Sequence, residues 1–84
     1  MTKEEIGSIL RRSPKSNLTA FRFSLKKRNE IQGYFVNARD YLHLNSKNYW
    51  YVLRTDKKDE WLATHNPDLL LLFPGDVFLR IQAL

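Results

Sequence analysis

The sequence contains no cysteine, which excludes disulfides and thiolate metal sites from its 84 residues. Proteins of reducing compartments usually lack disulfides, so this absence fits an intracellular location. The chain also has no apolar run of the length that a membrane helix needs. Its first ten residues carry acids and lack the long apolar centre of a secretory signal. We therefore expect a soluble cytoplasmic protein with no membrane partner.

Signatures of catalysis and cofactor binding are missing as well. The sequence has no GxGxxG, GxxxxGK[ST] or GxSxG motif, and it is too short for a full dinucleotide-binding fold. His43 and His65 are isolated from each other and have no ligand-like spacing, so they indicate no metal site. Asp56, Asp59 and Glu60 surround two lysines, which is typical of a solvated turn. We expect no enzymatic activity, no cofactor and no metal.

The residues that are present favour one small domain with an uneven charge. Apolar residues make up 43% of the chain, enough for a single core in a domain spanning residues 1–84. Residues 1–28 carry eight basic and two acidic side chains, whereas residues 29–84 carry six basic and seven acidic ones. Such an excess of positive charge favours an anionic partner such as a nucleic acid. A solvated basic surface with no partner is the alternative interpretation.

The first third of the chain is expected to form a helix and a β-hairpin. Thr2 and Glu5 have the spacing of a capping box, and Pro14 disfavours a longer helix, so the helix should cover about residues 3–12. Its core-facing side chains should be Ile6, Ile9 and Leu10. Apolar and polar residues alternate in "LTAFRFSL", and both faces of "IQGYFVNA" are fairly apolar, which predicts two strands joined by the polar turn "KKRNE".

Further strands and a helical insert are expected in the rest of the chain. "DYLHL" is interpreted as a third short strand, and "YWYVLRT" as a strong one. "DKKDEWLATHNPD" should contain a short helical turn capped by Asp56 or Asp59. A last strand should begin near Asp76, with Val77, Leu79 and Ile81 on one face. This order predicts an α+β fold: an N-terminal helix, a small bent antiparallel sheet or barrel, and a short helical insert before the last strand.

Two local rules compete in "LLLLFPGDVFLRI". Asn66 as a cap, Pro67 at the first helical position and Asp68 in the first turn predict a short helix. The glycine and acid at Gly75 and Asp76, followed by apolar residues, instead favour two strands about a tight turn. We favour a helix over residues 67–73, because capping has a direct mechanism.

Two segments resemble the motifs of the Sm-like family, which includes the bacterial Hfq proteins. In "FRFSLKKRNEIQGYFVNARDYLHLN", the family's glycine, acid and asparagine would correspond to Gly33, Asp40 and Asn45. In "LFPGDVFLRI", the second motif would correspond to Gly75, Asp76, Val77 and Ile81. Asp40 and Asn45 each lie one residue later than the family pattern prefers, and Pro74 replaces an arginine that helps form the family's uridine pocket. The resemblance implies an Sm/SH3-like barrel that forms a ring by strand pairing between subunits, and it supports the fold more than the RNA site.

The resulting hypothesis is a non-enzymatic module that binds RNA or single-stranded nucleic acid and forms a homo-oligomer. Basic side chains bind phosphates, and exposed aromatic rings stack on bases. The alternative is a protein-interaction or assembly module with no nucleic-acid role, because the middle strands and "LLLLF" offer more apolar surface than a small core can hide. The candidate nucleic-acid-binding residues are Arg11, Arg12, Lys15, Arg22, Lys26, Lys27, Arg28, Tyr41, His43 and Asn45.

Overall fold

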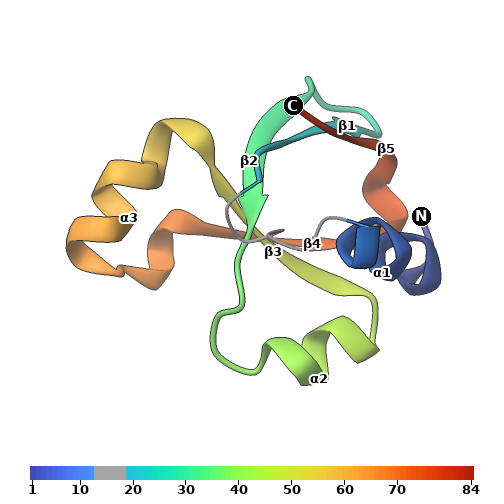
Figure 1. Cartoon of the computed structure of the whole chain (residues 1–84), viewed down its shortest axis with the longest axis horizontal. Coiled ribbons are helices and arrows are strands. Elements are labelled where there is room, and N and C mark those ends of the chain that lie inside the picture. Colours follow the sequence, from blue (N-terminus) through green and yellow to red (C-terminus); the bar gives the residue numbers. More distant parts are fainter. Residues whose placement is uncertain (13–18) are drawn as a thin grey trace.

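The computed structural model describes residues 1–12 and 19–84 and has an α+β fold (Figure 1). The elements in these residues are α1 (Lys3–Arg12), β1 (Phe21–Leu25), β2 (Ile31–Phe35), α2 (Tyr41–Ser46), β3 (Tyr49–Arg54), α3 (Lys58–Thr64), β4 (Leu70–Pro74) and β5 (Phe78–Ala83). The five strands form one antiparallel sheet in the order β4-β3-β2-β1-β5. Because β4 and β5 each pair with one neighbour among the described strands, the sheet is not closed into a barrel. No helix in the described part of the chain is long and apolar enough to cross a membrane.

Helix α1 begins at the predicted capping box. The backbone N–H of Glu5 donates to the Thr2 hydroxyl at 3.2 Å, and the N–H of Thr2 donates to the Glu5 carboxylate at 2.9 Å. The hydrogen bond from the backbone N–H of Thr2 favours the charged carboxylate, and together with the Thr2 side chain it holds the pKa of Glu5 below its ordinary value. The helix directs Ile6 into the core with no exposed surface, while Ile9 and Leu10 pack at its margin, as predicted.

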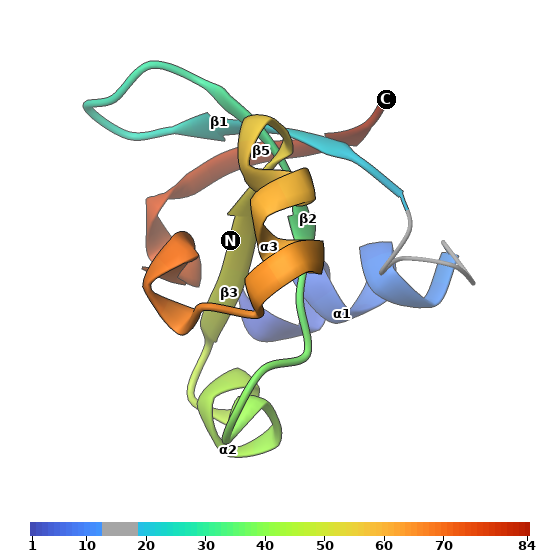
Figure 2. The ribbon, with the colours of Figure 1, turned by 90° about the vertical axis from the view of Figure 1, so that its left-hand side faces the viewer.

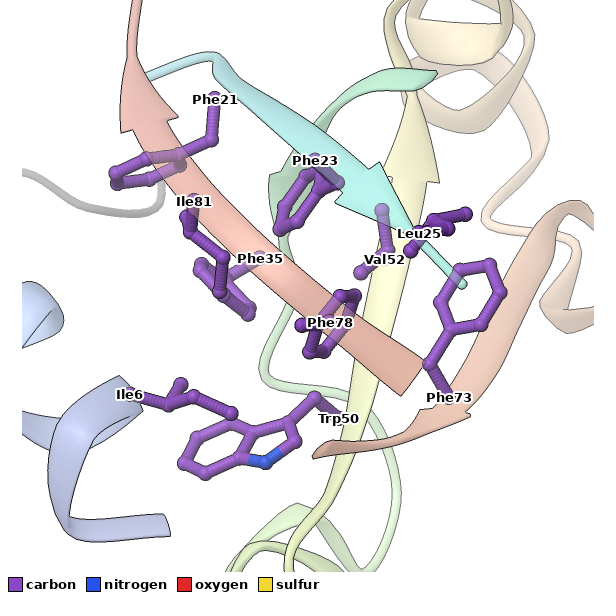
Figure 3. Close-up of a cluster of buried hydrophobic side chains, with 10 residues drawn as sticks. All are labelled: Ile6, Phe21, Phe23, Leu25, Phe35, Trp50, Val52, Phe73, Phe78 and Ile81. Carbon is purple, nitrogen blue, oxygen red and sulfur yellow. The ribbon is translucent and has the colours of Figure 1, made fainter. Parts of the chain in front are cut away.

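The core lies between the inner face of the bent sheet and α1, and it is mostly aromatic (Figure 3). Phe35 of β2 is at its centre, with ring centroids 5.4 Å from Phe21, 5.3 Å from Phe23 and 5.9 Å from Trp50. All three pairs meet edge to face, the arrangement that the quadrupoles of aromatic rings favour. The remaining members of the cluster are Ile6, Leu25, Val52, Phe73, Phe78 and Ile81.

Strand β5 contains a bulge that changes which of its side chains face the core. Its pairing with β1 shifts register between Ser24 and Leu25, so that Phe78 and Arg80 lie opposite consecutive residues of β1. Leu79 is therefore the extra residue and is 60% exposed, whereas Phe78 is 1% exposed. The prediction that Val77, Leu79 and Ile81 share a face is wrong, because it assumed an unbroken alternation along this strand.

The predicted third strand "DYLHL" is helix α2, which is a correction to the sequence interpretation. Asp40 precedes this helix with a φ of 61°, a left-handed conformation that acidic and amide side chains tolerate better than most. Leu42 points into solvent and is 72% exposed. The alternation of tyrosine, leucine and histidine over five residues was too short to distinguish a strand from one and a half helical turns.

The leucine run forms strand β4, so the predicted helix over residues 67–73 is also wrong. The Asn66 cap exists, because its side chain accepts a hydrogen bond from the N–H of Asp68 at 3.0 Å. However, the helical segment that follows is a single 3₁₀ turn, Pro67–Leu69. Pairing with β3 satisfies backbone groups that would otherwise lack partners, and it places Leu71 and Phe73 toward the core. Tertiary pairing therefore overrides the local capping signal here.

Helix α3 is the predicted helical insert and contains Trp61 and Leu62. Neither acid caps it: the N-cap is Lys57, whose side chain makes no capping hydrogen bond. Asp56 instead lies 3.4 Å from the Arg54 guanidinium. In Figure 1, α3 and α1 lie on opposite sides of the sheet, so α3 covers part of the outer face.

Asn48 joins three segments at the start of β3, and we call this set of contacts the Asn48 junction. Its side-chain nitrogen donates to the Met1 carbonyl at 3.0 Å, and its side-chain oxygen accepts from the Trp50 indole N–H at 2.8 Å. Its backbone carbonyl accepts from the N–H of Gly75 at 2.7 Å. A Cβ on Gly75 would overlap the Asn48 side chain, so a glycine is needed at the turn between β4 and β5. The amino group of Met1 donates to the carbonyls of Gly75 and Phe78 at 2.7 and 3.1 Å.

Gly33 lets β2 and β3 approach closely. A Cβ at this position would lie 2.7 Å from the backbone oxygen of Leu53 and 2.8 Å from a methyl carbon of Val52. The backbone of a central strand cannot move away without disturbing the pairs on both of its sides.

We predict opposite effects for two Gly→Ala substitutions. Gly33→Ala should lower the free energy of unfolding by about 1–3 kcal/mol, because the new methyl group overpacks the β2–β3 contact. Gly7→Ala should raise it by about 0.5–1 kcal/mol, because alanine favours a helix and its Cβ meets only the Arg11 side chain at 3.4 Å. Urea denaturation of both variants measures the difference. Equal effects would show that Gly33 is not a close-contact position.

Candidate nucleic-acid interface

The outer face of β1 and β5 is polar and basic. Arg22 lies opposite Gln32 of β2 and Gln82 of β5, and Ser24 lies opposite Arg80. Directly opposed residues of antiparallel strands point to the same side, and here that side is away from the core. The hairpin between β1 and β2 adds three exposed basic residues. We call this surface the basic face; its cations are Arg22, Lys26, Lys27, Arg28 and Arg80.

The hairpin cations are held by a well-defined turn. Lys27 has a φ of 58°, and the N–H of Lys26 donates to the Val77 carbonyl at 2.9 Å. The Arg28 guanidinium lies 5.5 Å from the centre of the Phe73 ring, a cation–π contact that orients its charge. These contacts fix the base of the turn while the charged groups of the two lysines extend into solvent.

One acid lowers the charge of the basic face. Arg22 Nε is 3.5 Å from Glu30 Oε1, and the two side chains are 43% and 55% exposed. An exposed pair of this kind contributes little to stability, so it leaves Arg22 free to exchange Glu30 for a phosphate at low cost.

Of the predicted site residues, Arg22 lies on the outer side of β1, and Lys26, Lys27 and Arg28 are exposed in the hairpin that follows it. Arg11 and Arg12 lie at the end of α1, where Arg12 adjoins Phe21. This is the opposite end of β1 from the hairpin, so these two arginines and the hairpin cations lie apart along the strand. Lys15 lies outside the described residues.

The α2 residues form a separate group. Figures 1 and 2 place α2 and the β1–β2 hairpin at opposite ends of the molecule. His43 is exposed on α2, and Tyr41 is half-buried. The Asn45 amide is oriented with its nitrogen toward the backbone carbonyls of Tyr41 and Tyr49. In this orientation it donates hydrogen bonds to them at 3.2 and 2.8 Å. Asn45 therefore anchors α2 to β3 and does not present its side chain to a ligand.

A cleft lies between α3 and the outer face of β2 and β3, and the sequence interpretation missed it. Its volume is about 390 Å³. Its walls include Tyr34 and Leu53 from the sheet, and Lys58, Trp61 and His65 from α3 and its end. We call this space the α3 cleft. Tyr34 follows Gln32 at the strand period of two, so it points to the same outer side as Arg22.

The α3 cleft contains aromatic rings and a cation in contact with each other. Lys58 Nζ lies 5.0 Å from the centre of the Tyr34 ring. The Trp61 and His65 rings are 5.2 Å apart and tilted by 51°. Helix α3 contains no buried residue, so Trp61 is held over the sheet without entering the core. In the sequence, the only sign of the α3 cleft was a tryptophan, Trp61, placed among charged residues.

The outer face of β3 and β4 is apolar. Tyr49 lies opposite Pro74, and Tyr51 lies opposite Leu72, on the side away from the core. Tyr49 and Leu72 are 40% and 45% exposed. We call this surface the apolar face. It adjoins β4, which is an edge of the sheet formed by the described strands.

The described surfaces differ in chemistry: one is basic, one is an aromatic cleft and one is apolar. Within residues 1–12 and 19–84, no three histidine, aspartate or glutamate side chains are grouped as a metal site would require. Comparisons with protein-family models, curated proteins and solved structures find no match to the chain. The function must therefore be inferred from the surfaces themselves.

We predict that the two tryptophans differ in their contribution to stability. Trp61→Ala should change the free energy of unfolding by no more than about 1 kcal/mol, because Trp61 is outside the core. Trp50→Ala should cost about 3–5 kcal/mol or prevent folding, because Trp50 is 5% exposed and packs on Phe35. Urea denaturation monitored by circular dichroism measures both. A loss at Trp61 comparable to that at Trp50 would mean that the α3 cleft is part of the core.

Proposed function

We propose that the protein is a non-enzymatic, cytoplasmic module that binds RNA or another single-stranded nucleic acid on the outer face of its sheet. The observation that carries this proposal is the succession of Arg22 and Arg80 on the outer side of β1 and β5 and of three exposed cations in the adjoining hairpin. Cations arranged in this way bind phosphates and release the counterions that surround a nucleic-acid strand.

The neighbouring aromatic cleft favours a single strand over a duplex. Proteins that bind single strands combine a basic track for the backbone with aromatic rings on which bases stack. Here Tyr34 continues the outer face from Gln32, the partner of Arg22, so the basic face and the α3 cleft adjoin. A duplex hides the faces of its bases and would use only the cations.

An Sm-like relationship is part of this proposal. The antiparallel strand order, the 3₁₀ turn Gly75–Val77 before β5, and the close contacts at Gly33 and Gly75 support it. Pro74 lies in β4 where that family has an RNA-contacting arginine, and Asn45 anchors α2. The proposed binding surface is therefore the basic face, not the family's uridine pocket.

We predict that neutralising one hairpin cation weakens binding in a salt-dependent manner. Lys26→Gln should lower the affinity for a labelled oligouridine strand and make the slope of log K against log salt less steep by about 0.7, the value of one phosphate contact on a single strand. Lys47→Gln is the matched control, since Lys47 is an exposed lysine beside α2, at the far end from the hairpin. Fluorescence anisotropy over a range of salt concentrations measures both.

Two outcomes would contradict the nucleic-acid proposal. The first is the absence of oligouridine binding by the unmodified protein at low salt. The second is an equal loss of affinity in Lys26→Gln and Lys47→Gln, because uniform attraction to a positive protein would not distinguish the two positions.

Assembly into a homo-oligomer is the second candidate function, and the apolar face favours it. Exposed apolar surface next to an edge strand is commonly covered by another chain. Tyr49 and Leu72 are accessible beside β4, which has an unpaired edge within the described sheet.

We predict that Leu72→Lys shifts the protein from oligomer to its 10.0 kDa monomer, because a charge cannot be buried at an apolar contact at low cost. Leu42→Lys is the control, since Leu42 is exposed on α2, outside the apolar face. Light scattering measures the mass of each variant. A monomeric unmodified protein would remove the assembly candidate.

A further inference from the structure

Apart from Phe35, the residues that line the α3 cleft lie outside the core cluster. Leu53 closes the floor and is 3% exposed although it faces outward, whereas Trp61 and Tyr34 keep part of their rings accessible. Trp61 belongs to a helix with no buried residue, so its ring gains little from packing within this chain. Its ring is therefore available to a ligand.

We infer that the α3 cleft takes one unpaired nucleobase of the bound strand, stacked on Trp61, while the basic face holds the phosphates. This inference rests on the proposed function and assigns it a base-binding site. Every base has a flat π-face, so stacking of this kind tolerates different sequences.

The dimensions and lining of the cleft fit a small planar ligand. A volume of about 390 Å³ lies at the lower end of the range of about 300–1,000 Å³ for small-molecule sites. The lining combines rings with polar groups, among them the Asn37 side chain and the Lys58 ammonium. A base needs this combination, because its faces are apolar while its edges form hydrogen bonds.

Lys58 connects the cleft to the charge of the strand. Its ammonium lies 5.0 Å from the centre of the Tyr34 ring, over the π-face. A cation–π contact at a partly exposed site is weak, so the ammonium can turn to the phosphate of a base that enters the cleft. Asp59 and Glu60 lie on the same helix but do not line the cleft. The strand should therefore enter from the side of β1.

The two tryptophans of the chain make the inference directly measurable. Trp50 is 5% exposed and its indole N–H is bonded to Asn48, so a ligand cannot reach it. Trp61 lines the cleft. Quenching of fluorescence by a stacked base should therefore come from Trp61, and it should disappear in Trp61→Leu.

We predict two results from titrations with oligouridine and with an abasic sugar–phosphate strand of equal length. Oligouridine should quench Trp61 fluorescence, whereas the abasic strand should bind through its phosphates without quenching. Trp61→Leu should bind oligouridine roughly tenfold more weakly and bind the abasic strand as the unmodified protein does. Leu42→Ala is the control, since Leu42 is 72% exposed on α2, outside the α3 cleft and the apolar face, and it should leave both affinities unchanged.

The outcomes separate this inference from the proposed function. If both strands bind equally and oligouridine does not quench Trp61, base stacking is overturned while phosphate binding on the basic face stands. If neither strand binds, the proposed function and the inference both fail. If a polyglutamate peptide quenches Trp61 and oligouridine does not, the cleft is a site for an acidic protein segment, which also overturns the inference.

Discussion

The Asn48 junction is the contact on which the arrangement of the fold depends. The indole N–H of Trp50 is buried in an aromatic core and needs an acceptor, which the Asn48 side chain supplies at 2.8 Å. The same amide donates to Met1, and the backbone carbonyl binds the turn at Gly75. One residue thus fixes the start of α1, the entry to β3 and the link between the two edge strands. Its φ of 65° is one that asparagine tolerates better than most residues.

The aromatic core decides where function can lie. Rings fill most of the inner side of the sheet (Figure 3), where a hollow of about 250 Å³ remains beside Arg12, Phe21 and Ile81. The outer side is divided by the strand order: cations on β5 and β1, rings and Lys58 at β2 and β3, and apolar side chains toward β4. A nucleic acid and a second copy of the chain would therefore use neighbouring halves of one surface, and the two candidate functions are compatible.

The sequence predicted most of the first half of the fold because its signals there were local. The capping box at Thr2, the alternation of Phe21 and Phe23, and the polar hairpin turn each act within a few residues. The errors arose where a distant partner decides. The leucines became strand β4 because β3 needed a partner, and Arg80 joined the basic face through its pairing with Ser24. The α3 cleft combines residues from β2, β3 and α3, a combination that no local pattern contains.

The bulge at Leu79 shows that the spacing of residues along β5, and not only their type, determines which side chains face the core. Phe78 and Ile81 both face inward although three positions separate them, a distance that an unbroken strand would place on opposite faces. Deleting the extra residue would place them two positions apart, the spacing at which an unbroken strand keeps both side chains on one face. During evolution, the loss of a residue should therefore be accepted more readily at Leu79 than in the regular part of β5, where it would turn the following side chains to the other face.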